Sequence, residues 1–181
     1  MNREIQLPLT EKIAIELRAG DEVELTGDVL TGRDQACARF FQMIQAGEKL
    51  PVELAGQLLY FVGPSPARPG EIIGSAGPTT SGRMNKFLPT FLERGLRGFI
   101  GKGYLDQAVK DALVKHGGVY VGAIGGTGAL LSECIEATEV IAFPELLSEA
   151  VRRLKLKRFP VVVLNDARGG DLYAQAMKGA T

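Results

Sequence analysis

The stretch Gly77-Pro78-Thr79-Thr80-Ser81-Gly82-Arg83-Met84 organises this chain of 181 residues. Its glycines and proline predict a tight loop, and the apolar spacing over residues 84–92 predicts a helix behind it. The start of a helix offers free backbone N–H groups and the positive end of the helix dipole. Hydroxyls and a guanidinium placed there predict an anion site, because a planar fork of donors matches a carboxylate or a phosphate. An ordinary capped helix is the alternative, since Ser and Thr are good N-caps.

The spacing of Gly77 and Gly82 reproduces the glycine frame of a nucleotide-binding P-loop, but the next two residues depart from it. Arg83 stands where the P-loop has its phosphate-binding Lys, and Met84 stands where it has a Ser or Thr for Mg²⁺. A thioether is not a ligand for a hard cation that prefers oxygen. The sequence therefore favours a carboxylate over a nucleotide, and a nucleotide-binding protein stays as an alternative.

Two further basic residues, Arg33 and Lys102, each follow a predicted strand and lie beside glycine. Arg33, in Thr31-Gly32-Arg33-Asp34, opens a second loop-to-helix junction, with helical spacing over residues 36–44 and a stop at Gly47. Lys102 lies between two glycines directly after the short apolar strand predicted at residues 98–100. Both side chains are candidates for anion binding. The alternatives are a surface pair of Arg33 with Asp34 and a solvated Lys102, and His116 is explained by the end of a predicted helix.

Composition limits the classes of function. The chain has 21 basic and 21 acidic residues, which gives no electrostatic case for nucleic acid or an anionic membrane surface. No apolar run has the length of a membrane span, and the N-terminus lacks the apolar core of a signal peptide, so we expect a cytoplasmic protein. Cys37 and Cys134 are too few and too far apart to form a metal site. We expect both thiols to be buried in a reducing compartment.

The order of predicted elements is that of an α/β fold in a single domain, residues 1–181. Residues 3–30 are predicted to be largely strand, which suggests an additional β layer beside the βα alternation. Further strands are predicted at residues 58–62, 98–100, 119–121, 138–143 and 159–164. Helices are predicted at residues 104–115, 129–135 and 144–156, with Pro89 expected to kink or restart the helix that follows Met84.

The motifs together resemble the β region of class I fumarases and L(+)-tartrate dehydratases over roughly residues 22–173. The resemblance rests on Thr31-Gly32-Arg33-Asp34, Gly77–Met84, Ile100-Gly101-Lys102-Gly103 and Gly125-Gly126-Thr127-Gly128-Ala129-Leu130-Leu131, then on Val140–Leu146, Phe159-Pro160, Asn165-Asp166 and Asp171-Leu172. Two departures are Cys37, where relatives commonly have His, and Thr127-Gly128 in place of small alanines. Both leave open whether fumarate or tartrate is the substrate.

This resemblance implies a three-layer β/β/α swivelling domain, as in the C-terminal domain of class I fumarase, and a place in a two-subunit hydro-lyase. A separate α subunit is implied to bind a [4Fe-4S] cluster whose open iron acts as a Lewis acid, with no cluster or metal on this chain. The implied reaction is the reversible hydration of fumarate to L-malate in the tricarboxylic acid cycle, by an α2β2-like hetero-oligomer. L(+)-tartrate dehydration, or a non-catalytic anion- or nucleotide-binding module, is the alternative.

The resemblance also assigns roles to individual residues. Arg33, Arg83 and Lys102 are implied to clamp the carboxylates of a C4 dicarboxylate, Thr80 to hydrogen-bond the substrate, and Thr79 to take the proton from C3. A lone hydroxyl is a poor base near neutral pH, so Thr79 is expected to be activated by the partner subunit. We expect the three cations to project toward one concave surface that is left open for that subunit.

Overall fold

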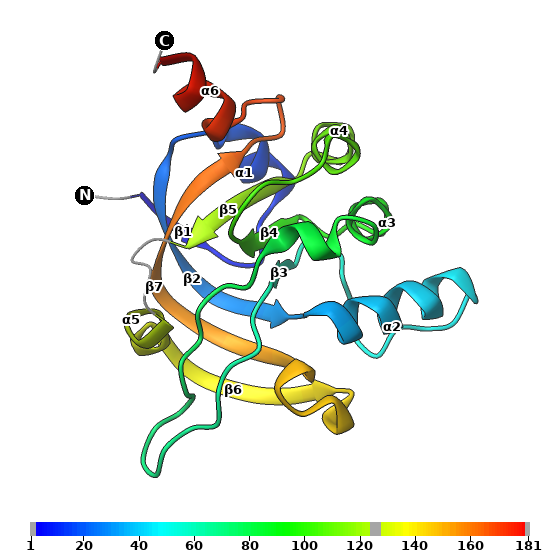
Figure 1. The fold of residues 1–181 in the computed structure, drawn as a ribbon, viewed down its shortest axis with the longest axis vertical. Helices are drawn as coiled ribbons and strands as arrows, with labels where there is room; N and C mark the ends of the chain where they lie inside the picture. The colour runs from blue at the N-terminus through cyan, green and yellow to red at the C-terminus, as the bar shows by residue number, and fades with distance from the viewer. Residues whose placement is uncertain (1–2, 124–127, 180–181) are drawn as a thin grey trace.

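Strands and helices alternate along the chain, as the sequence predicts, in a mixed α/β architecture (Figure 1). A computed structural model describes residues 3–123 and 128–179. The strands are β1 (Arg3–Gln6), β2 (Glu22–Thr31), β3 (Leu58–Tyr60), β4 (Gly98–Gly101), β5 (Val119–Ala123), β6 (Ile135–Ala142) and β7 (Val151–Asn165). The helices are α1 (Glu11–Glu16), α2 (Asp34–Gln45), α3 (Leu88–Glu93), α4 (Gln107–His116), α5 (Gly128–Glu133) and α6 (Leu172–Gly179), with short 3₁₀ helices η1 (Ser81–Met84) and η2 (Pro144–Glu149).

The sheet closes on itself through its longest strand. Strands β1 to β5 pair side by side and all run parallel. Strand β7 is antiparallel to β5 at one end and antiparallel to β2 over most of its length. The pairings therefore run from β2 through β3, β4 and β5 to β7 and back to β2, and β6 extends the sheet beyond β7.

The two faces of this sheet bury separate apolar cores. Helices α2, α3 and α4 cover one face, where Phe40, Phe91 and Leu113 pack against strand residues such as Phe99. The other face is covered mainly by the sheet itself, because its core is formed largely by strand side chains, together with Ala14 of α1 and Leu131 of α5. Consecutive residues of the 58–62 segment alternate between the two cores, which explains its unbroken apolar sequence.

Several predicted boundaries are confirmed. Helix α2 ends next to Gly47, and α4 ends at Gly117, which adopts the left-handed conformation typical of a helix stop. Pro89 lies in the first turn of α3, so the apolar pattern after Met84 is divided between η1 and a new helix, as predicted for that proline.

Other predictions from the sequence are wrong. Of residues 13–17, predicted as a strand, residues 13–16 belong to helix α1, which Thr10 caps by accepting a hydrogen bond from the Ile13 N–H. Residues 151–156, predicted as a helix, form the first half of β7, where every buried side chain pairs with a sheet neighbour. The C-terminal segment, for which no structure was predicted, forms α6. Cys37 is buried as expected, whereas Cys134 is partly exposed.

Candidate functional site

The 77–84 segment is held at the carboxyl ends of two neighbouring parallel strands. The Thr79 N–H donates to the Phe61 carbonyl at 2.7 Å, directly after β3. The Ser81 N–H donates to the Lys102 carbonyl at 2.9 Å, directly after β4, and Thr80 and Lys102 form a parallel β-bridge. These backbone bonds place Thr79, Thr80 and Lys102 together at the carboxyl ends of β3 and β4.

Beneath these strand ends, the buried Ser81 links the end of β4 to a side chain of β5. Its Oγ accepts a hydrogen bond from the Lys102 N–H at 3.2 Å and lies 2.9 Å from the Tyr120 hydroxyl of β5. The Tyr120 hydroxyl donates to the Gly103 carbonyl at 3.0 Å, and burial raises the pKa of Tyr120 above its ordinary value. A Cβ atom on Gly101 would lie 2.0 Å from Ser81 Oγ, so only glycine permits this approach.

The guanidinium of Arg83 lies within contact of a hydroxyl and a carboxylate. Its Nη2 donates to Thr79 Oγ1 at 2.9 Å and forms an ion pair with Asp34 Oδ2 at 3.1 Å. Asp34 begins helix α2, directly after the carboxyl end of β2, and lies 3.9 Å from Arg33 Nε. Asp34 thus joins Arg33 and Arg83, whose Cα atoms belong to different loops. The surface pair expected between Arg33 and Asp34 is present, but the shorter contact of Asp34 is with Arg83.

Arg33 is the least solvated of the three candidate cations. Its side chain passes over Gly63, where a Cβ atom would lie 2.7 Å from Arg33 Nη1. Its Nε is buried, and no described residue provides it with a hydrogen-bond acceptor. A buried donor without an acceptor costs free energy, so this side chain is suited to an incoming anion. By contrast, Thr80, Arg83 and Lys102 are exposed at the surface.

The structure therefore brings all five predicted site residues to the carboxyl ends of β2, β3 and β4. Arg33, Arg83 and Thr79 belong to one side-chain network, and Thr80 and Lys102 are joined through their backbones. The supporting residues Ser81 and Tyr120 lie below them. Tyr120 was not predicted as part of the site, although a tyrosine within a fully apolar strand signals a buried hydroxyl that needs a partner.

The helix-dipole argument for this site is wrong. The segment after Thr80 forms only the four-residue η1, and α3 starts later, at Leu88. Thr80 occupies the N-cap position of η1 without making a side-chain cap hydrogen bond. A P-loop also needs a full helix at this place, so the nucleotide alternative loses its structural context. The anion site depends instead on the side chains of Arg33, Arg83 and Lys102, and on the buried Ser81 and Tyr120 below them.

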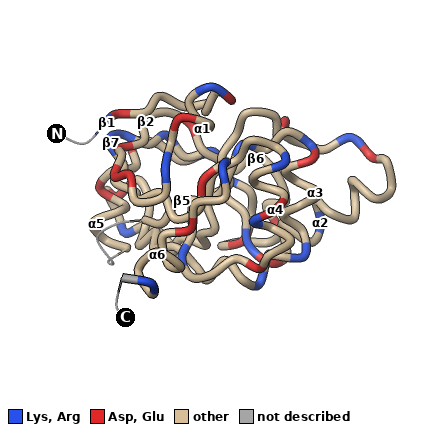
Figure 2. Tube along the Cα trace, turned by 90° about the horizontal axis from the view of Figure 1, so that it is seen from above, with Lys and Arg blue, Asp and Glu red and all other residues tan. Residues whose placement is uncertain are grey.

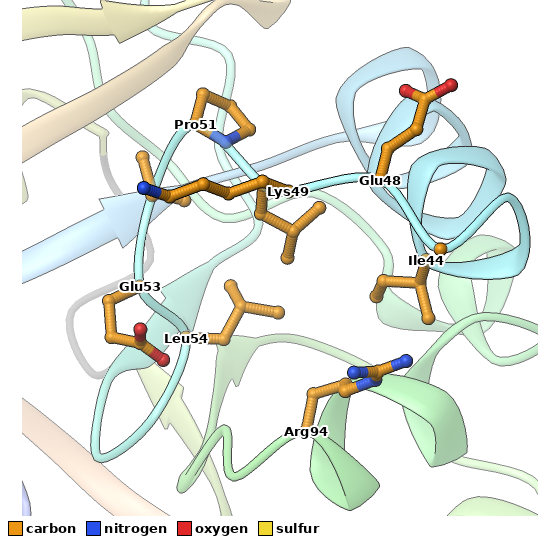
Figure 3. A pocket seen from close by; sticks show the side chains of 10 residues that line it. Ile44, Glu48, Lys49, Pro51, Glu53, Leu54 and Arg94 are labelled. Atoms are coloured by element: carbon orange, nitrogen blue, oxygen red, sulfur yellow. The ribbon is translucent and has the colours of Figure 1, made fainter.

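A cavity of about 480 Å³ lies elsewhere, between the end of α2, the 47–54 loop and the end of α3. Figure 3 shows Arg94 entering it from α3, with Leu54 and Ile44 on either side. No predicted site residue lines this cavity. Arg33 lies at the opposite end of α2, a helix of 12 residues, hence about 18 Å away along the axis. The cavity is therefore separate from the candidate site.

The charges of the molecule do not suggest a polyanion surface. Figure 2 shows Lys and Arg interspersed with Asp and Glu along the trace. None of the helices in the described part of the chain is both long and apolar enough to pass through a membrane. The glycine cluster at residues 125–127 lies outside the described residues, whereas Gly128 packs against the site loop, its carbonyl accepting from the Ala76 N–H at 3.1 Å.

Comparison with known proteins decides the family. The model of the family described as "Fumarase C-terminus" matches residues 1–176. The chain belongs to the fumarase C-terminus family. The resemblance of its motifs to class I fumarases and tartrate dehydratases is thereby confirmed.

Some relatives of this fumarase C-terminus chain are much longer than it, and another has about the same length. It is 38% identical over 155 residues to the anaerobic class I fumarate hydratase of Escherichia coli, and 37% identical over 160 residues to fumarate hydratase 2 of Leishmania major. These matches cover 84% and 87% of the chain, but only 28% of each relative. A Methanocaldococcus jannaschii protein, provisionally named L(+)-tartrate dehydratase subunit beta, is 32% identical over 176 residues, covering 94% of the chain and 90% of that protein.

Proposed function

We propose that this chain is the β subunit of a two-subunit iron–sulfur hydro-lyase that interconverts fumarate and L-malate. The named activity of the larger relatives supports the reaction, and the M. jannaschii protein, named as a β subunit and matched over 90% of its length, supports a separate subunit. The proposal includes an α subunit, an α2β2-like assembly and a cytoplasmic location, where free thiols such as Cys37 and Cys134 persist. It also includes the three-layer β/β/α swivelling fold, which the closed sheet and the one-sided layer of α2, α3 and α4 support.

The observation that carries this proposal is the convergence of Arg33, Arg83 and Lys102 with two threonines at one edge of the sheet. A C4 dicarboxylate has two carboxylates, and cations on three separate segments of the chain can hold both at once. The fork of Arg83 suits a carboxylate, and the Nε of Arg33, which has Asp34 at 3.9 Å but no hydrogen-bond acceptor among the described residues, offers a donor whose burial penalty an anion would remove. Thr80, exposed beside Lys102, is placed to hydrogen-bond the same ligand.

Thr79 is the residue we propose as the base that removes the C3 proton of malate. Thr79 must first lose its own hydroxyl proton to act as this base, and the Arg83 Nη2, which donates to Oγ1, stabilises the alkoxide that then accepts the C3 proton. Asp34 holds the same nitrogen from the other side and thereby fixes where the guanidinium lies. Activation of Thr79 therefore begins within this chain, in addition to whatever the partner subunit contributes.

The side chains described here do not fit an iron–sulfur cluster. Within residues 3–123 and 128–179, His, Cys, Asp and Glu side chains form no group of three that could hold a metal. Cys37 belongs to the core under the helices, where burial and nearby carboxylates raise the pKa of its thiol, and Cys134 follows α5 beside the other core. We therefore place the [4Fe-4S] cluster on the α subunit.

L(+)-tartrate dehydration is the second candidate, because a relative of which this chain covers 90% carries that name. Tartrate is also a C4 dicarboxylate and would use the same clamps. Cys37 does not decide between the two substrates directly, since it is fully buried and cannot touch a ligand.

Co-expression of this chain with the cysteine-bearing α subunit of the same genome tests the proposal. The assembled pair should convert malate to fumarate or dehydrate L(+)-tartrate, as followed by absorbance of the unsaturated product. The purified chain alone should be colourless and inactive. Activity of the chain by itself, or an assembled pair that is inactive on malate, fumarate and tartrate, would show that the proposed function is wrong.

A further inference from the structure

A groove of about 330 Å³ opens between the 64–73 loop and the segment formed by β6 and η2. In Figure 1 this loop extends from the sheet and runs beside β6. The walls of the groove carry three large apolar side chains that are exposed to solvent, namely Ile72 (52% exposed), Val140 (40%) and Leu147 (77%). Exposed apolar groups gathered around one groove are typical of an interaction site.

Two polar atoms of groove-lining residues are buried without a partner. Thr138 Oγ1 on β6 and Arg152 Nε on β7 make no hydrogen bond with any described residue. They belong to adjacent strands, since Arg152 pairs with Val140, two residues along from Thr138. A buried donor and a buried hydroxyl left unpaired cost free energy that a bound chain could recover through its own carbonyl or carboxylate groups.

The groove is already formed in the isolated chain, because hydrogen bonds hold the 64–73 loop in place. The Ser65 N–H donates to the Ser75 carbonyl at 3.1 Å, which holds the two arms of the 64–73 loop together. On the opposite wall, Leu147 has φ of 55° and ψ of −112°, a conformation that a leucine adopts only at a cost. Strain at an exposed apolar residue gives the isolated chain no benefit, and is consistent with a role in contact with another molecule.

The groove is continuous with the candidate site. Gly63 lies against both of them, because a Cβ on this residue would meet Arg33 Nη1 at 2.7 Å and the carbonyl oxygen of Ser148, a groove-lining residue, at 3.2 Å. Glu149, which follows Ser148 in η2, accepts a hydrogen bond from the Gln35 N–H at 2.8 Å. This bond fixes η2 against the start of α2. A segment bound in the groove would therefore end beside Arg33.

We propose that this groove is the docking surface for the α subunit, a proposal that rests on the function proposed above. The fumarate hydratases that match this chain have more than two thirds of their length outside the matched region, so a large additional body accompanies this domain in those relatives. The groove offers that body an apolar surface next to the cations it must reach. The occupant is an extended segment with apolar side chains whose carbonyl or carboxylate oxygen accepts from Arg152 Nε.

A second copy of this chain fits the groove less well. In a symmetric dimer whose two-fold axis passed beside Arg152, this residue would face its own counterpart, a second unpaired donor, rather than an acceptor. Such a contact would cover Ile72 and Leu147 but leave Arg152 Nε without an acceptor.

The test measures binding of the co-expressed α subunit by Leu147→Asp and Ile72→Asp variants, with Val114→Asp on the distant α4 as a matched control. Val114 is also an exposed apolar residue, at 45%. We expect each groove variant to weaken binding by about tenfold or more, and the control to bind within about twofold of the unchanged chain. Arg152→Lys, which removes Nε, should weaken binding by about threefold to tenfold.

The outcomes separate this inference from the proposed function. An active unchanged pair whose affinity is the same with Leu147→Asp and Ile72→Asp chains would overturn the docking surface and leave the function standing. Loss of binding with an unchanged melting temperature of the variant supports the proposal, and loss accompanied by unfolding is resolved by Arg152→Lys. Sedimentation that shows a homodimer of the unchanged chain, dispersed by Leu147→Asp, would also overturn it.

Discussion

Arg83 makes both of its contacts through a single nitrogen, Nη2, which faces Thr79 and Asp34. The rest of its planar fork remains directed at an exposed surface. Lysine keeps the charge but has no fork, so Arg83→Lys separates bidentate binding from general electrostatics. We expect kcat/KM of the assembled enzyme to fall roughly tenfold to a hundredfold, since a charge-assisted hydrogen bond contributes about 1.5–3 kcal/mol. Steady-state kinetics on malate measure the change.

The matched control for this prediction is Arg153→Lys, on β7. Arg153 pairs with Glu139 on the surface of the sheet, at 3.6 Å, and belongs to no part of the candidate site. Its kcat/KM should stay within about twofold of the unchanged enzyme, because an exposed pair contributes about 1 kcal/mol or less. An Arg83→Lys enzyme that also stays within about twofold of the unchanged enzyme would show that Arg83 acts through its charge alone and not through its planar fork.

Thr79→Val removes the proposed base while keeping nearly the same side-chain volume. The hydroxyl of Thr79 accepts from Arg83 and caps no helix, so its loss should change the melting temperature little. If Thr79 takes the C3 proton, kcat should fall by about a hundredfold or more, with a smaller change in KM. Rates and melting curves are compared with those of Thr90→Val on α3. A kcat close to that of the unchanged enzyme would remove Thr79 from the catalytic residues.

At the scale of elements, the site depends on how closely the loops after β3 and β4 approach each other. A methyl group on Gly101 would lie 2.0 Å from Ser81 Oγ and 2.9 Å from the Phe61 ring, so Gly101→Ala must displace one of them. Displacement of Ser81 would also break its contacts with Lys102 and Tyr120. We expect a loss of about 1–3 kcal/mol in the free energy of unfolding, measured by urea denaturation.

Gly82→Ala is the control, since it adds the same methyl group to the same segment. The nearest atom to that methyl would be the Tyr104 carbonyl oxygen at 3.7 Å, an ordinary contact. The variant should be neutral or more stable by up to about 1 kcal/mol, because alanine restricts the unfolded chain. A Gly101→Ala chain as stable as Gly82→Ala would mean that the strand ends are not packed as tightly as this geometry requires.

Elements with a strong local pattern could be predicted from the sequence, and elements set by their neighbours could not. The apolar 58–62 run and helices α2 and α4, each followed by a glycine, appear close to where their patterns put them. The helix predicted for residues 151–156 was wrong because the basic residues there resemble the end of a helix, although Leu154 and Leu156 alternate as in a strand. Its pairing with both β2 and β6 decided its conformation, and those partners are distant in sequence.

At the scale of the whole molecule, the closed sheet explains why the site residues meet. Parallel neighbours present their carboxyl ends at the same edge, so residues after β2, β3 and β4 converge once that strand order is fixed. The sequence supplied the five residues through motif spacing and family resemblance. It could not supply Asp34 as the bridge between Arg33 and Arg83, or Tyr120 as support, because these contacts depend on strand order and side-chain packing.

The two ends of the chain are joined through the carboxylate of Asp166, which is only 4% exposed. Its Oδ2 accepts from the Ala19 N–H at 2.9 Å, and its Oδ1 accepts from the Arg168 and Gly170 N–H groups, each at 2.8 Å. Burial raises the pKa of Asp166, but these three donors outweigh burial and hold it below the ordinary value. The Asp171 pKa is likewise lowered against the effect of burial, chiefly by Lys110.

A folded-state pKa below the unfolded value means that the unfolded chain binds more protons, so stability rises with pH across this interval. The contribution of Asp166 is therefore complete above the ordinary carboxyl pKa of about 4 and is lost as the pH falls through the lower folded value. Asp166→Asn turns an amide N–H₂ toward one of the backbone donors. At pH 7 we expect it to lower the free energy of unfolding by about 1–3 kcal/mol.

Urea unfolding of both chains at intervals between pH 7 and pH 3 measures this dependence. The unchanged chain should lose stability as the pH falls below about 4 to 5, and the difference from Asp166→Asn should narrow over the same interval. A pH dependence should persist in the variant, because Asp171 still loses its bond to Lys110 on protonation. Curves that run parallel from pH 7 to pH 3 would mean that Asp166 is not the carboxylate that couples protonation to the joining of the chain ends.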